Sequence, residues 1–441
     1  MFRSFAVANY RLWFAGALVS NVGTWMQRVA QDWLVLTQLT DDDATAVGVT
    51  MALQFGPQLA LLPITGLVAD RFDRRKLLIV TQLTMSALGL GMAAVTLLGV
   101  VQLWMVFGFA LGLGVAAAFD APARQAFVSE LVPRDYLANA VSLNSASFNG
   151  ARLIGPAVAG LLVAVVGSGW VFLINAFTFA AVIAALVLLK QSEFTTFTKP
   201  PRAKGQFAGG VRYVRGRPDI LLVLAMIAIM GTLGFNFPIF VSAMARIQFH
   251  EGAGVFGVLS SVLAIGSVTG ALLAARREHP RLRTIGLAAI GFGVSLGAAA
   301  LMPNVVSLGV TIVVVGFSAL TLMTAANAYV QTTTPPDLRG RVMALYMAIF
   351  MGGTPIGAPL VGWLADTFGP RWSLGAGAAS GFIAAGIAGI YYVRTRHLHL
   401  RWTPEHRWPL TVQRGPDAVP ADQARELATT EIAVVEAETQ R

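Results

Sequence analysis

Residues 66–76, GLVADRFDRRK, carry two acids and four bases, whereas the segments on either side are almost free of charge. Charged side chains avoid hydrocarbon, so a charge cluster between two apolar runs indicates a short loop at a membrane surface. The neighbouring runs, near 46–69 and 77–99, are each long enough for a helix to cross a bilayer, which takes about 20 residues. We therefore expect this stretch to join two transmembrane helices.

The composition of the whole chain agrees with a membrane protein. Of its 441 residues, 56% are hydrophobic and 12% are charged, against about 25% charged residues in soluble domains. Cysteine is absent, which excludes disulfide bonds and thiolate metal sites. The net charge of +10 comes from bases in loops between apolar runs, so it indicates membrane topology rather than nucleic-acid binding.

Twelve apolar runs have the length of a membrane span. They lie near 12–38, 46–69, 77–99, 102–128, 138–165, 169–189, 219–245, 253–275, 284–301, 305–330, 340–365 and 371–393. Alternate connections hold eighteen Lys and Arg residues, and the other connections hold Arg246 and Arg371. Because bases concentrate on the cytoplasmic side, this bias predicts a multi-pass protein of the bacterial inner membrane with both termini in the cytoplasm.

A long polar stretch divides the spans into two sets of six. It covers 190–218 and predicts a cytoplasmic linker between an N-terminal six-helix bundle, 1–189, and a C-terminal six-helix bundle, 219–393. The segment 394–441 follows as a cytoplasmic tail, whose basic part we expect to lie against anionic lipids. A shift of 202 residues superimposes the halves, matching Gly114 with Gly316, Gly155 with Gly357 and Gly160 with Gly362. This register indicates a duplicated helical unit, an organisation common in secondary transporters.

With twelve spans, two repeated halves and this charged loop, the chain resembles the major facilitator superfamily over nearly its whole length. Its loop is similar to the family pattern G-x-L-a-D-r-x-G-r-[RK], with Asp73 in place of the usual glycine; the matching residues are Gly66, Asp70, Arg71, Arg74 and Arg75. The resemblance implies an all-α membrane protein with twelve transmembrane helices in two pseudo-symmetric six-helix bundles.

The resemblance also implies a gating role for the loop, in which Asp70 engages the eleventh helix and closes the cytoplasmic side. The alternative is a positively charged membrane anchor without a gating role, which explains the bases alone. In the fifth span, Gly155, Pro156 and Gly160 resemble the family's antiporter motif, in which a kink and small residues set the swing of the helix. The stretches 119–160 and LGFNFPIF in the seventh span resemble the branch of enterobactin, macrolide and multidrug exporters.

Five ionisable residues lie inside the predicted spans of the first half, and such residues are costly in a membrane unless they serve a function. They are Arg28, Asp32, Asp120, Arg124 and Arg152, and we expect them to handle protons. Asp32 is the preferred protonation site, because desolvation and a neighbouring arginine act on a carboxylate in opposite directions. The alternative is a set of permanent ion pairs, Arg28 with Asp32 and Asp120 with Arg124 or Arg152.

Aromatic, amide and methionine side chains in several spans suit an adaptable pocket for bulky amphipathic molecules. The candidate substrate-binding residues are Trp25, Asn149, Phe235, Asn236, Phe237, Asn327, Tyr346, Met347 and Phe350. Met343, Met347 and Met351 recur every four residues on the eleventh span, and ordinary packing is the alternative explanation for them.

These features predict a secondary active transporter, a proton-coupled exporter of drugs or siderophores that works by alternating access. The alternative is an uncoupled or lipid-moving membrane protein, or a scaffold that retains the fold. The chain lacks phosphate-cradling and zinc-protease motifs, so we do not expect an enzyme. We expect no cofactor, no metal and no nucleic acid, and a monomer whose partners are a small-molecule substrate, protons and membrane lipids.

Overall fold

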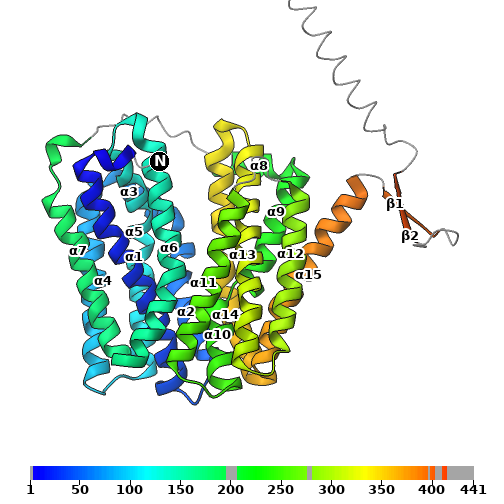
Figure 1. The fold of residues 1–441 in the computed structure, drawn as a ribbon. Coiled ribbons are helices and arrows are strands. Elements are labelled where there is room, and N and C mark those ends of the chain that lie inside the picture. Colours follow the sequence, from blue (N-terminus) through cyan, green and yellow to red (C-terminus); the bar gives the residue numbers. More distant parts are fainter. Residues whose placement is uncertain (1–2, 195–205, 276–280, 396–397, 403–409, 415–441) are drawn as a thin grey trace, which may run out of the picture. The chain divides into compact units, whose positions relative to one another are not determined.

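The computed structural model describes residues 3–194, 206–275, 281–395, 398–402 and 410–414. Residues Met1–Ala385 form one compact unit of long, adjacent helices (Figure 1). Among the described residues, ten helical segments are long and apolar enough to cross a membrane. Two further segments, the first and second of the chain, complete the twelve. The first carries polar residues along its length, and the second is divided at Leu61 into two shorter helices.

The first six segments form the first half of the molecule. After the short 3₁₀ helix η1 (Arg3–Ala6), they are α1 (Ala8–Leu34) with the π-helical turn η2 (Val35–Leu39), α2 (Ala44–Ala60) with α3 (Leu62–Arg71), α4 (Arg74–Leu97), α5 (Leu103–Leu131), α6 (Arg134–Val166) and α7 (Ser168–Leu188). The break at Leu61 follows Pro57 and precedes Pro63, and proline disrupts the helix around it.

The last six segments form the second half. They are the seventh segment, built from α9 (Pro218–Ile229), η4 (Met230–Gly234), α10 (Phe237–Ala243) and η5 (Met244–Gln248), then α11 (Ala253–Ala275), α12 (Leu282–Ala300), α13 (Val305–Thr333), α14 (Pro336–Phe368) and α15 (Pro370–Thr395). Between the halves lie the 3₁₀ turn η3 (Gln191–Glu193) and the helix α8 (Gln206–Arg215).

The duplication predicted by the 202-residue shift is visible in the packing of matched glycines. A Cβ added at Gly114 of the fourth segment would lie within 3 Å of the Leu53 carbonyl oxygen in the second segment. A Cβ added at Gly316 of the tenth segment would lie within 3 Å of the Leu263 carbonyl oxygen in the eighth. At Gly155 it would meet Trp25 of the first segment, and at Gly357 it would meet Thr232 of the seventh. Small residues let helix backbones approach closely in membranes, so the same glycine positions set the same contacts in both halves.

The two halves meet mainly through two helix pairs, α2 with α14 and α6 with α11. These four helices lie in the middle of Figure 1, between α4 and α7 on one side and α9 and α12 on the other. In the shift of 202 residues α2 corresponds to α11 and α6 to α14, so the interface has the pseudo-twofold symmetry of the repeat.

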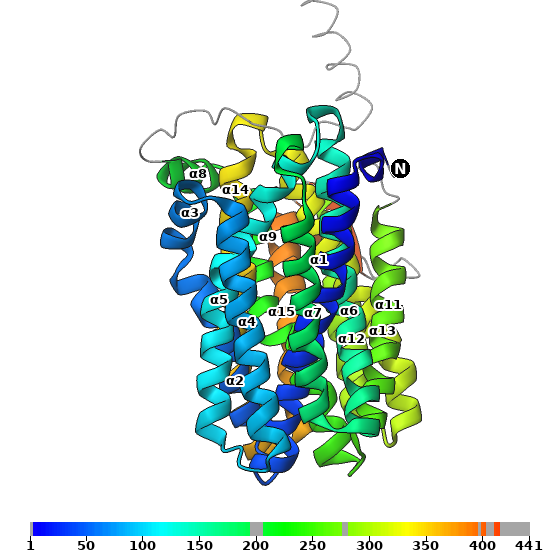
Figure 2. The same ribbon diagram turned by 90° about the vertical axis from the view of Figure 1, so that its left-hand side faces the viewer.

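The two ends of this unit differ in charge. We call the end that carries α3, α8 and the start of the chain the basic end; it is uppermost in Figures 1 and 2. We call the opposite end, where Asp41, Asp42 and Asp43 precede α2, the acidic end. Asp43 accepts a hydrogen bond from the Ala46 amide and Asp73 from the Lys76 amide, so α2 begins at the acidic end and α4 at the basic end with an N-cap.

Residues Gly386–Arg441 form a second compact unit. It contains the end of α15 and an antiparallel hairpin of β1 (Leu398–Trp402) and β2 (Leu410–Arg414), in which Leu398 pairs with Arg414. Most of the segment predicted to be a tail, including all of 415–441, lies outside the described residues.

Candidate functional site

Arg28 and Asp32 are buried one helical turn apart on α1, 6% and 5% exposed. The Gln54 Nε2 of α2 donates a hydrogen bond to Asp32 Oδ1 at 3.3 Å. The Arg28 guanidinium carbon lies 4.4 Å from the centroid of the Phe55 ring and 5.3 Å from that of Trp25. The two charged groups therefore make their direct contacts with α2 and with aromatic faces.

Arg152 on α6 extends this cluster to the second half. Its guanidinium carbon lies 5.5 Å from the centroid of the Trp25 ring and 5.5 Å from that of Phe350 on α14. Arg28 and Arg152 thus share one indole ring, and Arg152 reaches across the boundary between the halves.

An aromatic cluster continues from Phe350 into the second half. The ring of Phe235 lies 6.1 Å from Phe350, 6.1 Å from Phe237 and 5.8 Å from Phe292, measured between centroids. On the other side, Trp25 lies 6.0 Å from both Phe55 and Phe148. Aromatic rings from both halves therefore surround the two arginines, and we call this set of rings with Arg28, Asp32 and Arg152 the central cluster.

Asp120 and Arg124 occupy a separate place on α5. Arg124 Nε donates to Asp120 Oδ2 at 2.9 Å, and Asp120 Oδ1 also accepts from Thr81 at 2.9 Å and from Gln82 at 2.7 Å. The Arg124 guanidinium carbon lies 5.5 Å from the ring centroid of Trp13. The Asp120 carboxylate thus accepts from three donors on two helices. Its ion pair with Arg124 is one of the pairs expected if these charges form permanent ion pairs instead of handling protons.

The other predicted substrate residues are more dispersed. Asn236 is fully buried at the break between η4 and α10, where its Nδ2 donates to the Thr232 carbonyl and its Oδ1 has no partner among the described residues. Asn327 accepts a hydrogen bond from Gln331 on α13, and Asn149 donates to the Ser145 carbonyl of its own helix. On α14, Tyr346 is buried, whereas Met347 is 45% exposed.

The charged loop of residues 66–76 makes several contacts inside the first half. Arg74 forms an ion pair with Glu130 and donates from Nε to the Ala69 carbonyl, and Arg75 donates to the carbonyls of Leu186 and Val187. Arg71 is exposed, and the side chain of Asp70 lies outside the described residues. A Cβ added at Gly66 would meet no heavy atom of the described residues within 4 Å.

The glycines of the fifth segment do permit close approach. A Cβ at Gly155 would lie 2.5 Å from the Cβ of Trp25, and one at Gly160 would lie 2.5 Å from the Gly257 nitrogen of α11. Pro156 lies inside α6, one residue after Gly155. Gly155 therefore brings α6 against the residue that both arginines contact, and Gly160 brings the two halves together.

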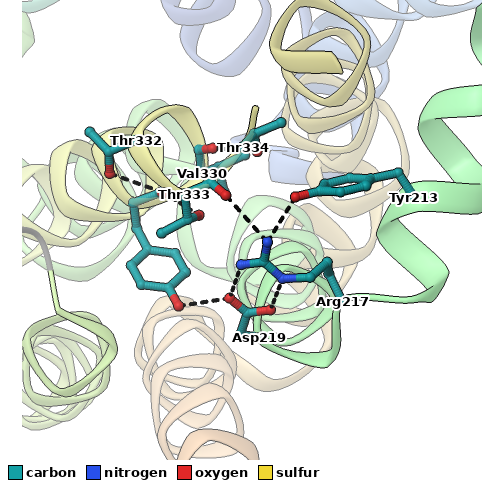
Figure 3. Close-up of polar contacts among 8 residues, drawn as sticks. Tyr213, Arg217, Asp219, Val330, Thr332, Thr333 and Thr334 are labelled. Atoms are coloured by element: carbon teal, nitrogen blue, oxygen red, sulfur yellow. Dashed lines mark hydrogen bonds and ion pairs between the residues drawn. The ribbon is translucent and has the colours of Figure 1, made fainter. Parts of the chain in front are cut away.

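A polar cluster at the basic end of the second half joins three helices (Figure 3). Arg217 donates two hydrogen bonds to Asp219, at 2.9 and 2.7 Å, and one to the Tyr213 hydroxyl at 2.8 Å. Tyr329 of α13 donates to Asp219 at 2.8 Å. Hydrogen bonding to Asp219 raises the pKa of Arg217 above its usual range, so this arginine stays charged and holds α8, α9 and α13 together.

The sequence reasoning missed four residues that contact the central cluster or join the two halves. Gln54, Phe55 and Phe292 lie in the central cluster or bind a member of it, and Asp366 of α14 accepts hydrogen bonds from the amides of Ala44 at 2.8 Å and Thr45 at 2.7 Å on α2. Gln54 is a polar residue inside a predicted span, which was the available signal, whereas Asp366 lies just beyond the predicted span 340–365. Among the described residues, no group of three or more His, Cys, Asp or Glu residues is suited to hold a metal ion.

The fold is that of solved membrane transporters. A bacterial homologue of the human lysosomal transporter Spinster, in an inward-facing unoccupied conformation, superimposes with a TM-score of 0.70 at 15% identity, covering 87% of this chain and 97% of that chain. A D-xylose–proton symporter superimposes with a TM-score of 0.65 at 14% identity, covering 86% and 96%. The protein therefore has the major facilitator fold, with twelve transmembrane helices in two six-helix bundles.

The sequence identifies the family within this class. The family described as transmembrane secretion effector, within the major facilitator superfamily, matches residues 2–414, and the chain belongs to it. The chain is 26% identical over 376 residues to the staphyloferrin A transporter of Staphylococcus aureus, covering 81% of this chain and 90% of that protein. It is 28% identical over 413 residues to the multidrug efflux pump Tap of Mycolicibacterium fortuitum (88% and 96%) and 25% identical over 407 residues to the enterobactin exporter EntS of Escherichia coli K12 (90% and 94%). The protein is thus a multi-pass membrane transporter, as the sequence predicted.

Proposed function

We propose that the protein exports amphipathic small molecules from the bacterial cytoplasm and couples their exit to proton entry. The substrate binds at the central cluster, and the two halves rock about it so that the cluster faces one side of the membrane at a time. The observation that carries the proposal is Asp32, a buried carboxylate one helical turn from Arg28, in a cluster whose arginines contact aromatic rings of both halves.

The chemistry of Asp32 suits a coupling site. A carboxylate in a low-dielectric interior is costly when charged, and neighbouring cations and hydrogen bonds reduce that cost. Gln54, which donates to Asp32, lies on α2, and α2 packs against the opposite half. As the halves rock, α14 with Phe350 moves relative to Arg152 and the charged groups of the first half. The surroundings of Asp32, and thus the free energy of its protonation, change with this movement.

The direction of transport and the orientation rest on two further observations. Of the three relatives above, one is named an exporter and another an efflux pump. The eighteen bases on alternate connections support an orientation in which the basic end faces the cytoplasm of a bacterial cell, and we propose that both termini are cytoplasmic. In this orientation the charged loop of residues 66–76 acts as the cytoplasmic gate, with Asp70 as the acid that engages the eleventh segment.

Reconstitution of the full chain in proteoliposomes tests the coupling. With a pH-sensitive dye inside, an outward gradient of a transported compound, found among siderophores, macrolides and tetracyclines, should drive protons inward. The Asp32→Asn variant should abolish substrate-driven proton movement but retain exchange of labelled for unlabelled substrate. Asp41→Asn, a neutralised exposed acid at the acidic end, serves as the matched control and should behave as the wild type.

Two results would contradict the proposal. Unchanged proton movement in Asp32→Asn would remove Asp32 from the coupling mechanism. Substrate flux that is insensitive to the proton gradient in the wild type would favour the uncoupled or lipid-moving alternative, and no flux of any tested compound or of fluorescent lipid would favour a scaffold.

A further inference from the structure

The central cluster contains more positive than negative charge. The guanidinium carbons of Arg28 and Arg152 lie 5.3 and 5.5 Å from the centroid of the Trp25 ring, so both cations contact the same indole. Asp32 is the carboxylate of this cluster, and its described hydrogen bond comes from Gln54. With Asp32 ionised the cluster carries one net positive charge, and with Asp32 protonated it carries two.

The arginines lack anionic partners in direct contact. Among the described residues, neither Arg28 nor Arg152 forms an ion pair with a carboxylate, whereas Arg124 does so with Asp120 in the same half. The Nε of Arg28 is buried and has no hydrogen-bond partner, although the side chain is only 6% exposed. Contact with aromatic faces offsets part of the cost of a buried cation, by about 0.5–2 kcal/mol per contact. A buried cation ordinarily needs a full partner as well.

We propose that the central cluster binds an anionic group of the substrate, a carboxylate or a similar planar or tetrahedral oxyanion, between Arg28 and Arg152. The inference rests on the proposed transport function and narrows its substrate class to amphipathic anions. The guanidinium group is a planar fork of donors that matches carboxylate oxygens, and its unpartnered Nε in Arg28 is one such donor. The anion would neutralise the charge that the chain itself leaves unpaired.

The rings around the arginines define the rest of the ligand. Phe55 and Phe148 pack against Trp25 on one side, and Phe235 packs against Phe350 on the other. A flat apolar body can stack among these rings while its anionic group lies at the arginines. A cationic amphipath would meet the same rings but would be repelled by two guanidinium groups in a low-dielectric environment.

A charge series on the wild-type protein tests this proposal without any substitution. Naphthalene-2-carboxylate, naphthalene-2-carboxamide and 2-naphthylmethylammonium share one apolar body and differ in charge. We expect the carboxylate to raise the melting temperature of the purified protein and to bind at least tenfold more tightly than the amide, with the ammonium weakest. Equal binding of all three compounds, or preference for the ammonium, would overturn the proposal.

Substitutions then locate the anionic group. Arg152→Gln should abolish the preference for the carboxylate over the amide, while Arg152→Lys, which keeps the charge, should retain most of it. Arg246→Gln, at the acidic end, should leave the preference unchanged. A preference that survives in both Arg28→Gln and Arg152→Gln, each folded by its melting curve, would place the anion elsewhere and refute this assignment.

The two proposals fail in distinguishable ways. If proteoliposomes couple the efflux of neutral or cationic compounds to proton entry and no anion is preferred, the exporter function stands and the anion site does not. If the carboxylate binds tightly but no compound moves, the anion site stands and the transport coupling does not.

Discussion

The two ends of the protein use the same kinds of polar group in different ways. At the acidic end, Asp366 of the second half accepts hydrogen bonds from the amides of Ala44 and Thr45 in the first half, and Arg246 forms an ion pair with Asp42 across the same boundary. At the basic end, Arg74 pairs with Glu130 inside the first half, and Arg217 pairs with Asp219 inside the second.

Apolar contacts between the halves also differ between the acidic end and the basic end. Near the acidic end, Trp33 stacks on Phe256 of the other half with ring centroids 5.0 Å apart, and a Cβ at Gly48 would lie 2.7 Å from the Pro359 Cα. Near the basic end, a Cβ at Gly66 or Gly340 would meet no atom of the described part of the chain within 4 Å. At the acidic end these contacts therefore join the two halves, whereas at the basic end they stay within each half. A transporter whose halves rock requires such an asymmetry in one of its states.

The largest effect should come from a bulky residue in the acidic-end interface. Gly48→Leu places a side chain against the backbone of α14, so it should force this end apart and reduce transport more than tenfold. Because the chain has no cysteine, spin labels at Val100→Cys and Val306→Cys can report the separation of the halves at this end, and the measured distance should increase.

Gly66→Leu is the matched change at the other end. A Cβ at this position has no contact with the residues that the structure describes, so the distance between labels at Val100 and Val306 should stay as in the wild type. If Gly48→Leu and Gly66→Leu alter this distance equally, the ends do not differ in the way described here.

An intermediate effect is expected from removal of the carboxylate that caps α2 from the opposite half. Loss of an N-cap acceptor costs about 1 kcal/mol, which corresponds to a shift of about fivefold in the ratio of closed to open states at the acidic end. Asp366→Ala should therefore broaden the distance distribution between the same labels toward longer distances. Asp73→Ala removes a cap of the same kind within the first half, and an equal broadening in that control would show that the effect is not specific to the interface.

The smallest effect should come from the ion pair between Arg246 and Asp42. The Arg246 side chain is 39% exposed and that of Asp42 is 33% exposed, and exposed ion pairs contribute about 0.2–1 kcal/mol. Arg246→Gln should change the transport rate less than about fivefold, and high salt should reproduce its effect in the wild type. A loss as large as that in Gly48→Leu would mean that charge, rather than packing, holds this end closed.

The sequence predicted the twelve segments and the repeat because both depend on patterns along the chain. It predicted less of the site, since spacing along one helix does not say what a neighbouring helix contributes. Asp120 and Arg124, four residues apart, form an ion pair. Arg28 and Asp32 have the same spacing but bind Phe55 and Gln54 of α2 instead. The rotation of α2 decides this difference, and no periodicity in the chain encodes it directly.

The pattern of apolar runs also did not predict the breaks within the helices. The apolar run near 46–69 is continuous, yet the helix is interrupted at Leu61 between two prolines. The seventh segment contains π-helical turns before and after α10, with Asn236 at the break. Asp366 caps α2 although it lies 321 or more positions away along the chain. This contact arises only when the two halves pack together, so no local sequence pattern predicts it.

A reversible covalent link across the acidic end tests the rocking motion most directly. A Cβ at Gly254 would lie 3.8 Å from the Cβ of Ala164 in the other half, and one at Gly297 would lie 3.7 Å from that of Ala378 in the same half. Both separations suit a disulfide bond, for which the Cβ atoms lie about 3.8 Å apart. In proteoliposomes, oxidation of Ala164→Cys/Gly254→Cys should stop transport and reduction should restore it, while Gly297→Cys/Ala378→Cys stays active in both states. Full transport by the oxidised Ala164→Cys/Gly254→Cys protein, with the disulfide verified by mass spectrometry, would contradict the account.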